Sequence, residues 1–366
     1  MRLNRRQVLT ATGMAGASIM LGKGQASAAS DEGQGKSAGR TAWHQWIAAN
    51  RDHVGVVVDD GRGGRVAHRP FEEQILCSAI KVVHAAGFAL AVEQGRVKPG
   101  EQVRVGDWEK HYIGLDGGAH QEALKDLGIP FGNGFTADNP DHLVTLDDIV
   151  KVTVLHSDNA GADFLRTRVG DETLRAAAVR CGWPQVDTRS IMGEMLFLVL
   201  PERAPAPGTA VAQRRRVGDD LAAQALTDPQ LQLEIIGRFP HIPTAYDAQA
   251  AWAQGTWRGT AAGLTRIHRT IAGGRFPLAR THLERAYSGA LPPGVRGIGF
   301  KGGSLPGALT LAYSVRWENG RIGTAVVLTS QVPEELFNAP GELVDLVLGT
   351  LLDPPALREL ERSLVG

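Results

Sequence analysis

Residues 78–90 read Ser-Ala-Ile-Lys-Val-Val-His-Ala-Ala-Gly-Phe-Ala-Leu, with apolar side chains at helical spacing and a serine where the helix is expected to begin. Residues three apart share one face of a helix, so this spacing places the Lys81 amine within reach of the Ser78 hydroxyl. A serine needs a neighbouring base to act as a nucleophile, and a lysine kept neutral by burial is such a base. Taken alone, however, the pattern more often marks a helix-capping serine with a surface lysine.

Two further short motifs follow along the chain. Ser157-Asp158-Asn159 comes after residues 145–155, whose apolar pattern predicts a helix, and a second helix is expected to begin at Asn159. Lys301-Gly302-Gly303-Ser304 directly follows an apolar strand segment. Each motif alone is weak evidence. Their joint appearance in this order, on these predicted elements, is much less expected by chance.

The remaining pattern predicts an α+β fold. The expected elements are a helix at 41–50, a β-hairpin at 53–68, strands at 299–301, 309–317 and 322–329, and helices at 334–352 and 355–364. A mainly helical part, about residues 85–290, is therefore inserted between the N- and C-terminal segments of one sheet. Residues 201–216, rich in proline and arginine, are interpreted as a solvated insertion or linker.

With these motifs the chain resembles the penicillin-recognising serine hydrolases, and among them the class A β-lactamases, over roughly residues 41–350. Residues 145–165 look like the family's paired central helices, and residues 320–329 look like its penultimate hairpin and edge strand. The resemblance implies a β-lactamase/transpeptidase-like fold, with a five-stranded antiparallel sheet flanked by helices and an all-helical subdomain. A single hydrolase domain would span residues 41–366.

The resemblance also implies the catalytic residues. Ser78 would be the acylating nucleophile, Lys81 part of its proton-transfer apparatus, and Ser157 the relay that passes a proton to the leaving nitrogen. A hydrolysing class A enzyme further has a glutamate that, with an asparagine four residues on, holds the water that frees the acyl-enzyme. Glu194 lies in about the right place, but Leu198 stands where that asparagine is expected. Glu194 is thus either the deacylating base or a surface residue at a helix start.

Four residues would bind the substrate. Asn159 would hydrogen-bond the amide side chain of the substrate and Lys81, while Lys301 would supply positive charge for the substrate carboxylate. Gly303 and Ser304 would line the same site, and the backbone N–H groups of Ser78 and Ser304 would form an oxyanion hole. The family usually carries a hydroxyl residue where this chain has Gly302, so one hydrogen bond to the carboxylate is lost unless Ser304 or a water replaces it.

Two insertions distinguish this chain from the family pattern, one near residues 116–140 and one near 200–250. Either could wall or lid the active-site cleft and change the choice of substrate. Trp108 and Tyr112 are candidates to line that cleft, with plain packing as the alternative.

Composition excludes several classes of protein. The 366 residues hold 39 Lys and Arg against 39 Asp and Glu, so the strongly basic balance of a nucleic-acid binder is missing. Two cysteines, Cys77 and Cys181, cannot form a disulfide framework and are expected to be free, buried thiols. No zinc-ligand pattern or phosphate-binding glycine motif occurs, so we expect neither a metal nor a cofactor.

The first residues indicate export. Residues 1–28 combine a basic start, a weakly apolar stretch and the small-residue sequence Ala26-Ser27-Ala28, which is typical of a cleaved signal peptide. The paired arginines within residues 4–9 resemble a twin-arginine signal. Residues 29–40 would form a flexible leader. We therefore expect a periplasmic or secreted monomer without a stable membrane anchor.

The leading hypothesis is an exported serine hydrolase that opens β-lactam amides through an acyl-enzyme on Ser78. One alternative keeps the Ser/Lys machinery but acts as an esterase or as a D-Ala-D-Ala-type carboxypeptidase on cell-wall peptides. A second alternative is a β-lactam-binding domain that acylates without hydrolysis. In each case the partner is a small-molecule substrate or a cell-wall peptide or ester.

Overall fold

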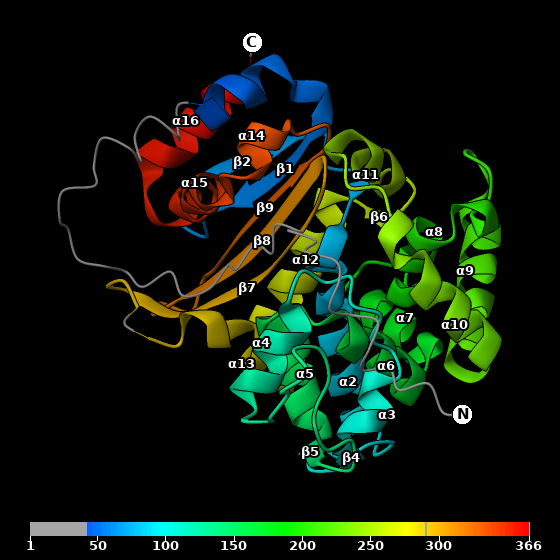
Figure 1. Ribbon diagram of the computed structural model, residues 1–366. Helices are drawn as coiled ribbons and strands as arrows, with labels where there is room; N and C mark the ends of the chain where they lie inside the picture. Colours follow the sequence, from blue (N-terminus) through cyan, green and yellow to red (C-terminus); the bar gives the residue numbers. More distant parts are fainter. Residues whose placement is uncertain (1–41, 290, 366) are drawn as a thin grey trace.

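The centre of the fold is a five-stranded antiparallel sheet. The computed structural model describes residues 42–289 and 291–365, and the expected signal peptide and leader, residues 1–40, lie outside the described residues. The strand order is β2-β1-β9-β8-β7 (Figure 1). One end of the chain supplies β1 (Val54–Asp59) and β2 (Arg65–His68), and the other supplies β7 (Val295–Leu305), β8 (Ala308–Trp317) and β9 (Ile322–Thr329). The sheet therefore closes only when the two ends of the chain meet.

The strands are nearly continuous apolar runs because both faces of the sheet are covered. In β8 and β9 almost every residue is buried, whichever face it points to. The register pairs Val56 of β1 with Val327 of β9, both of them β-branched. Gly320, at φ 82°, supplies the left-handed residue of the turn between β8 and β9.

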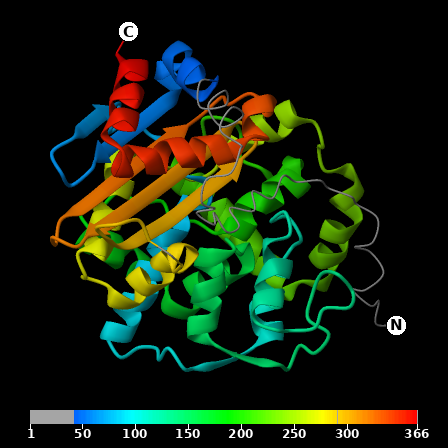
Figure 2. The same ribbon diagram turned by 90° about the vertical axis from the view of Figure 1, so that its left-hand side faces the viewer.

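Helices pack on both faces of the sheet. One face is covered by the helix at 42–49 together with α15 (Pro340–Leu352) and α16 (Pro354–Leu364), which lie across the strands in Figure 2. Their shared core includes Trp43, Tyr313 and Leu343, each with no exposed surface. The opposite face is covered by α12 (Ala261–Ala272) and α13 (Pro277–Glu284).

The helical part of the fold surrounds α2 (Lys81–Glu93), of which only the last two residues are not buried. Gly87 of α2 touches Leu174, since a Cβ at Gly87 would lie 2.3 Å from Leu174 Cδ2. None of the helices among the described residues is long and apolar enough to cross a bilayer. The other helices here are α3 (Val105–Glu109), α4 (Ala119–Asp126), α5 (Leu146–Leu155), α6 (Asn159–Val169), α7 (Asp171–Arg180), α8 (Ile191–Val199), α9 (Val211–Thr227), α10 (Pro229–Arg238) and α11 (Tyr246–Ala253).

Short elements connect these layers. Two small antiparallel pairs form, β3 (Gln74–Ile75) with β6 (Arg258–Gly259) and β4 (Gln102–Arg104) with β5 (Leu143–Thr145). A four-residue helix, α14 (Glu334–Phe337), precedes α15. Single 3₁₀ turns occur at Arg51–His53, Pro201–Arg203, Phe239–His241 and Arg285–Tyr287.

The predicted α+β class and five-stranded antiparallel sheet are confirmed. The interpretation of residues 201–216 as a solvated insertion is wrong for its second half, because α9 begins at Val211. Arg214 and Arg215 are only 14% and 15% exposed and form ion pairs with Glu194 and Asp171. Two arginines of the run are thus paired with acids that lie elsewhere in the sequence, which composition alone does not reveal.

Candidate active site

Ser78 lies in a 3₁₀ turn, Cys77–Ile80, that leads directly into α2. The preceding residue, Cys77, has φ 48°, a left-handed conformation that is rare for a residue with a side chain. From Gln74 to Ile80 every residue is buried except Ser78, which is half-buried. The turn therefore exposes one hydroxyl at the edge of an apolar core, and residues held in strained conformations often occur at functional sites.

Lys81 begins α2 and has no exposed surface. Its Nζ lies 2.9 Å from Ser78 Oγ, 2.6 Å from Asn159 Oδ1, and 2.5 Å and 3.3 Å from the carbonyl oxygen and Oγ of Ser157. Burial lowers the pKa of Lys81 to about 8, although the charge of Asp158 opposes this shift. An appreciable fraction of the amine is thus neutral near neutral pH, and it lies within hydrogen-bond distance of the serine hydroxyl.

Ser157 joins Lys81 to a second buried lysine. It lies between α5 and α6 with φ 67°, and its Oγ accepts a hydrogen bond from Lys301 Nζ at 3.0 Å. Burial, with the charge of Lys81 adding to it, holds the pKa of Lys301 well below its ordinary value. The three predicted motifs therefore meet at one hydroxyl, Ser157 Oγ, which lies within 3.3 Å of both amines.

The third motif lies on β7, beside the Ser78 turn. A Cβ at Gly303 would lie 2.1 Å from the backbone nitrogen of Ser78 and 2.7 Å from Cys77 Cβ. Only glycine allows this close approach of the two backbones. A Cβ at Gly302 would lie 2.8 Å from Phe300 Cζ and 3.0 Å from the carbonyl oxygen of Thr310, so the aromatic ring occupies the space of the missing side chain.

The polar contacts of the Glu194 side chain are with arginines. Its carboxylate is 1% exposed and forms ion pairs with Arg189 at 2.5 Å and Arg214 at 2.7 Å. Among the described residues, no hydrogen bond joins it to Ser78, Lys81 or Ser157. The interpretation of Glu194 as a surface residue at a helix start is wrong, because Glu194 is buried in the first turn of α8. Leu198, at the expected asparagine position, is buried in the apolar core beside α9.

Trp108 does not line an open cleft. It is fully buried, and its Nε1 donates to Asp158 Oδ2 at 2.7 Å. Tyr112 is half-buried and stacks on the ring of His120, with centroids 4.2 Å apart. Trp108 therefore contacts the Ser157–Asn159 segment directly, whereas Tyr112 packs on His120.

Sequence reasoning missed three buried ionisable residues near the motifs. Glu109 and His120 pair with each other at 3.2 Å, and Asp163 of α6 accepts from the backbone nitrogens of Ile191 and Met192 at the start of α8. Asp163 shares its helix face with Asn159 and Arg166, so its burial has no signal in the sequence of α6. His120 and Glu109 have no such signal either, because their partners come from different loops and helices.

Both cysteines are buried and free, as expected. Burial raises the pKa of the Cys77 thiol to about 12 and that of Cys181 to about 12. Neither thiol is therefore ionised near neutral pH, although Cys77 directly precedes Ser78.

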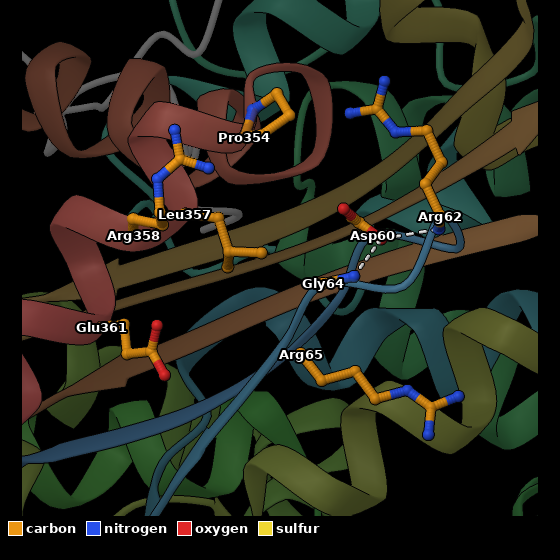
Figure 3. Close-up of a pocket in the computed structure, with 8 residues that line it drawn as sticks. All are labelled: Asp60, Arg62, Gly64, Arg65, Pro354, Leu357, Arg358 and Glu361. Carbon is orange, nitrogen blue, oxygen red and sulfur yellow. Dashed lines mark hydrogen bonds between the residues drawn. The ribbon is translucent and has the colours of Figure 1, made fainter.

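A separate hollow of about 410 Å³ lies between the β1–β2 turn and α16 (Figure 3). Arg62 is engaged there by the carbonyl oxygen of Leu351 and by the ring of Trp317, and Arg65 pairs with Asp59. None of the residues that line this hollow belongs to the three motifs. The lining residues are Asp60, Arg62, Gly64, Arg65, Pro354, Leu357, Arg358 and Glu361.

Comparisons with solved structures agree with this fold. A β-lactamase from Sphaerobacter thermophilus is 14% identical, with 89% of this chain and 95% of that chain covered and a TM-score of 0.52. A β-lactamase from Chitinophaga pinensis is 16% identical, with 88% and 98% covered and a TM-score of 0.50. The extended-spectrum β-lactamase TLA-3 is 13% identical, with 90% and 100% covered and a TM-score of 0.53. At these identities the likeness shows the fold.

The sequence itself matches a family. No curated protein matches the chain by sequence. The family model described as the beta-lactamase enzyme family matches residues 40–233, which hold the first two motifs, and the fold brings the third motif to them. The chain therefore belongs to the beta-lactamase enzyme family.

Proposed function

We propose that this protein is an exported serine hydrolase that opens β-lactam amides through an acyl-enzyme on Ser78. The observation that carries the proposal is the 2.9 Å distance between Lys81 Nζ and Ser78 Oγ, with the Lys81 amine fully buried. Residues 1–28 would direct the export and be removed. The two free cysteines are compatible with a twin-arginine route, because a chain that folds before export does not depend on disulfides formed afterwards.

In the first step, Ser78 Oγ attacks the carbonyl carbon of the amide and the neutral Lys81 amine accepts the hydroxyl proton. The negative charge that forms on the carbonyl oxygen would be stabilised by the backbone N–H groups of Ser78 and Ser304. The close approach of Gly303 to Ser78 supports this assignment, because it brings β7 against the serine turn. One such donor is worth roughly 3 kcal/mol of barrier.

In the second step, the C–N bond breaks and the leaving nitrogen takes a proton from Ser157 Oγ. Ser157 recovers a proton from Lys81, so the net result is an ester on Ser78 and an amine product. The positions of Lys81 and Lys301, at 3.3 Å and 3.0 Å from Ser157 Oγ, support this relay. Lys301 would also attract the substrate carboxylate, and Asn159 would bind the amide side chain of the substrate.

Release of the acyl group needs a base that activates water. Both oxygens of the Glu194 carboxylate are held by arginines, which favours slow deacylation. This arrangement keeps the alternatives open: an esterase or D-Ala-D-Ala-type carboxypeptidase with the same machinery, or a domain that binds β-lactams covalently without hydrolysis.

Incubation of the mature protein with a chromogenic cephalosporin, followed by mass spectrometry of the Ser78 peptide, separates these functions. Rapid turnover supports the β-lactamase, and a persistent adduct supports the binding domain or the carboxypeptidase. Ester cleavage without an adduct, lost in Ser78→Ala, supports the esterase. The proposal fails if neither an adduct nor Ser78-dependent turnover is found.

A further inference from the structure

A buried row of alternating charges lies behind Lys81. His120 of α4 stands between two carboxylates, with Nε2 3.2 Å from Glu109 Oε1 and Nδ1 3.2 Å from Asp158 Oδ1. The side chains of His120 and Asp158 have no exposed surface, and that of Glu109 is 6% exposed. Asp158 is also the acid whose charge acts most strongly on Lys81. The row therefore runs Glu109, His120, Asp158, Lys81.

With both carboxyl groups ionised, the two-sided contact favours a charged imidazole. A neutral imidazole has one ring nitrogen without a proton, and its lone pair would face a carboxylate oxygen here. With both nitrogens protonated, each donates to one carboxylate. Although burial opposes the charged form, the charge and hydrogen bond of Asp158 and the hydrogen bond of Glu109 raise the pKa of His120 to about 10. The stacked ring of Tyr112 and the edge contact with Trp108 hold the imidazole in place.

Asp158 needs this cation because it cannot reach water. Its carboxylate caps α6 by accepting from the backbone nitrogens of Ala160 and Gly161, at 3.3 Å and 2.8 Å, and it accepts from Trp108 Nε1. These bonds orient Asp158 and the residues on either side of it. Those two residues, Ser157 and Asn159, both contact Lys81. Without this cation, the charge of the buried carboxylate would act on the charged lysine unopposed and strengthen its hold on the lysine proton.

We propose that His120 is a positioning residue. Its imidazolium neutralises the charge of Asp158, so that Asp158 can orient Ser157 and Asn159 without holding a proton on Lys81. His120 thereby sets the pH range in which Ser78 is acylated. The effect passes through Asp158, since His120 itself does not contact the serine. This inference rests on the proposed acylation of Ser78.

Other ionisable groups also act on Lys81, and the effect of His120 on the Lys81 pKa adds to theirs. Asp116 and Asp163 act with Asp158 to stabilise the charged amine. Lys301 lies across Ser157, the Cys77 thiol is uncharged near neutral pH, and His84, one turn along α2, is kept neutral because burial lowers its pKa to about 3. Of these groups, Asp116 also interacts with His120, whose charge lowers the pKa of the Asp116 carboxyl. A shift in the titration of Lys81 in a His120 variant therefore reports the lost imidazolium together with its effect on Asp116.

The charge of His120 is measurable without any substrate. Nitrogen NMR of ring-labelled histidine in the mature protein, at about pH 8 and thus above the ordinary histidine pKa of about 6.5, is expected to show both ring nitrogens of His120 protonated. The signal that disappears in His120→Gln assigns the residue. A neutral His120 at this pH overturns the inference, whether or not the protein acylates.

The effect on catalysis is measured as the rate of Ser78 acylation by a fluorescent penicillin as a function of pH. In His120→Gln, Asp158 keeps the N–H donors of Ala160, Gly161 and Trp108. We expect these donors to keep Asp158 ionised, so that its charge acts on Lys81 without the opposing imidazolium. The acid limb of the profile is therefore expected to move up by about 0.5–1 pH unit. A limb that stays in place or moves down overturns the inference.

His282→Gln is the matched control. His282 is 1% exposed and its Nε2 lies 2.9 Å from Oδ1 of the half-buried Asp147, so the variant also removes a buried histidine that pairs with a carboxylate, but on α13 and α5. Its acid limb is expected to stay in place. A limb that moves up equally in both variants overturns the inference, because the shift then reflects general destabilisation.

If His120→Gln does not fold, Glu109→Gln decides. In Glu109→Gln the imidazolium of His120 no longer pairs with Glu109, so its charge opposes that of Asp158 more fully. The acid limb is therefore expected to move down. A limb that is unmoved or raised overturns the inference. Failure of the proposed function looks different, since the wild-type protein would then form no adduct at Ser78 while the NMR result would still be readable.

Discussion

Gly303 of β7 lies directly against the backbone of Ser78, so close that a Cβ at this glycine would be 2.1 Å from the Ser78 nitrogen. The relationship joins two segments of the chain that are far apart in sequence. It places the strand that carries Lys301 and Ser304 beside the serine turn, and it makes residue 303 a sensitive test of the site.

Gly303→Ala is expected to push β7 away from the serine turn and to lower the rate of Ser78 acylation by at least about 100-fold, since a misplacement of about 1 Å can cost that much. The overpacking is expected to destabilise the fold by about 1–3 kcal/mol. Gly341→Ala, where a Cβ meets no atom within 4 Å, serves as the control. Acylation at the wild-type rate in Gly303→Ala would contradict the assignment of β7 to the site. Mass spectrometry and urea denaturation supply the two readouts.

The rate of acylation is expected to follow the deprotonation of Lys81. Its pKa of about 8 means that the neutral amine increases about tenfold per pH unit below that value and reaches a plateau above it. The measurement is the acylation rate of Ser78 across this range. In Lys81→Met the limb should disappear along with most of the rate. A limb that persists in the variant would show that a different base serves Ser78.

Glu194→Gln is expected to be a stability variant. It leaves Arg189 and Arg214 with one fewer anion in a buried site, which typically costs about 3–5 kcal/mol, while the acylation rate of the folded fraction should stay near that of the wild type. Urea denaturation measures the first and stopped-flow mass analysis the second.

Glu234→Gln is the matched control, because it breaks an exposed pair with Arg203 whose loss should cost less than about 1 kcal/mol. If Glu194→Gln kept full stability and accumulated the acyl-enzyme, the residue would be the deacylating base, contrary to the arrangement in the structure.

The two thiols are expected to be inert in the native protein. Because burial raises the pKa of both Cys77 and Cys181, almost no thiolate exists near neutral pH, and neither should react with iodoacetamide until the chain unfolds. Peptide mapping after alkylation with and without denaturant checks this. Rapid native labelling of Cys77 would show that the serine turn opens readily.

Local pattern was sufficient for the elements that carry the motifs. The apolar spacing after Ser78 predicts α2, and the pattern of residues 145–155 predicts α5, for which the structure shows Thr145 as the N-cap. Strands β8 and β9 lie at 308–317 and 322–329, close to their expected ranges. These predictions succeed because the periodicity of helices and strands can be recognised from consecutive residues. The same reasoning did not predict the helix at residues 211–216, because the ion-pair partners of its arginines lie in other helices.

What the sequence by itself determined is the set of elements, the Ser78–Lys81 spacing within one turn, and the order of the three motifs. Only the tertiary structure decided which polar and charged groups contact one another. Ser157 links Lys81 to Lys301, and two arginines form ion pairs with Glu194. His120 lies between Glu109 and Asp158. The reason is physical. Backbone periodicity acts over a few residues, whereas burial and ion pairing depend on which distant segments share a core.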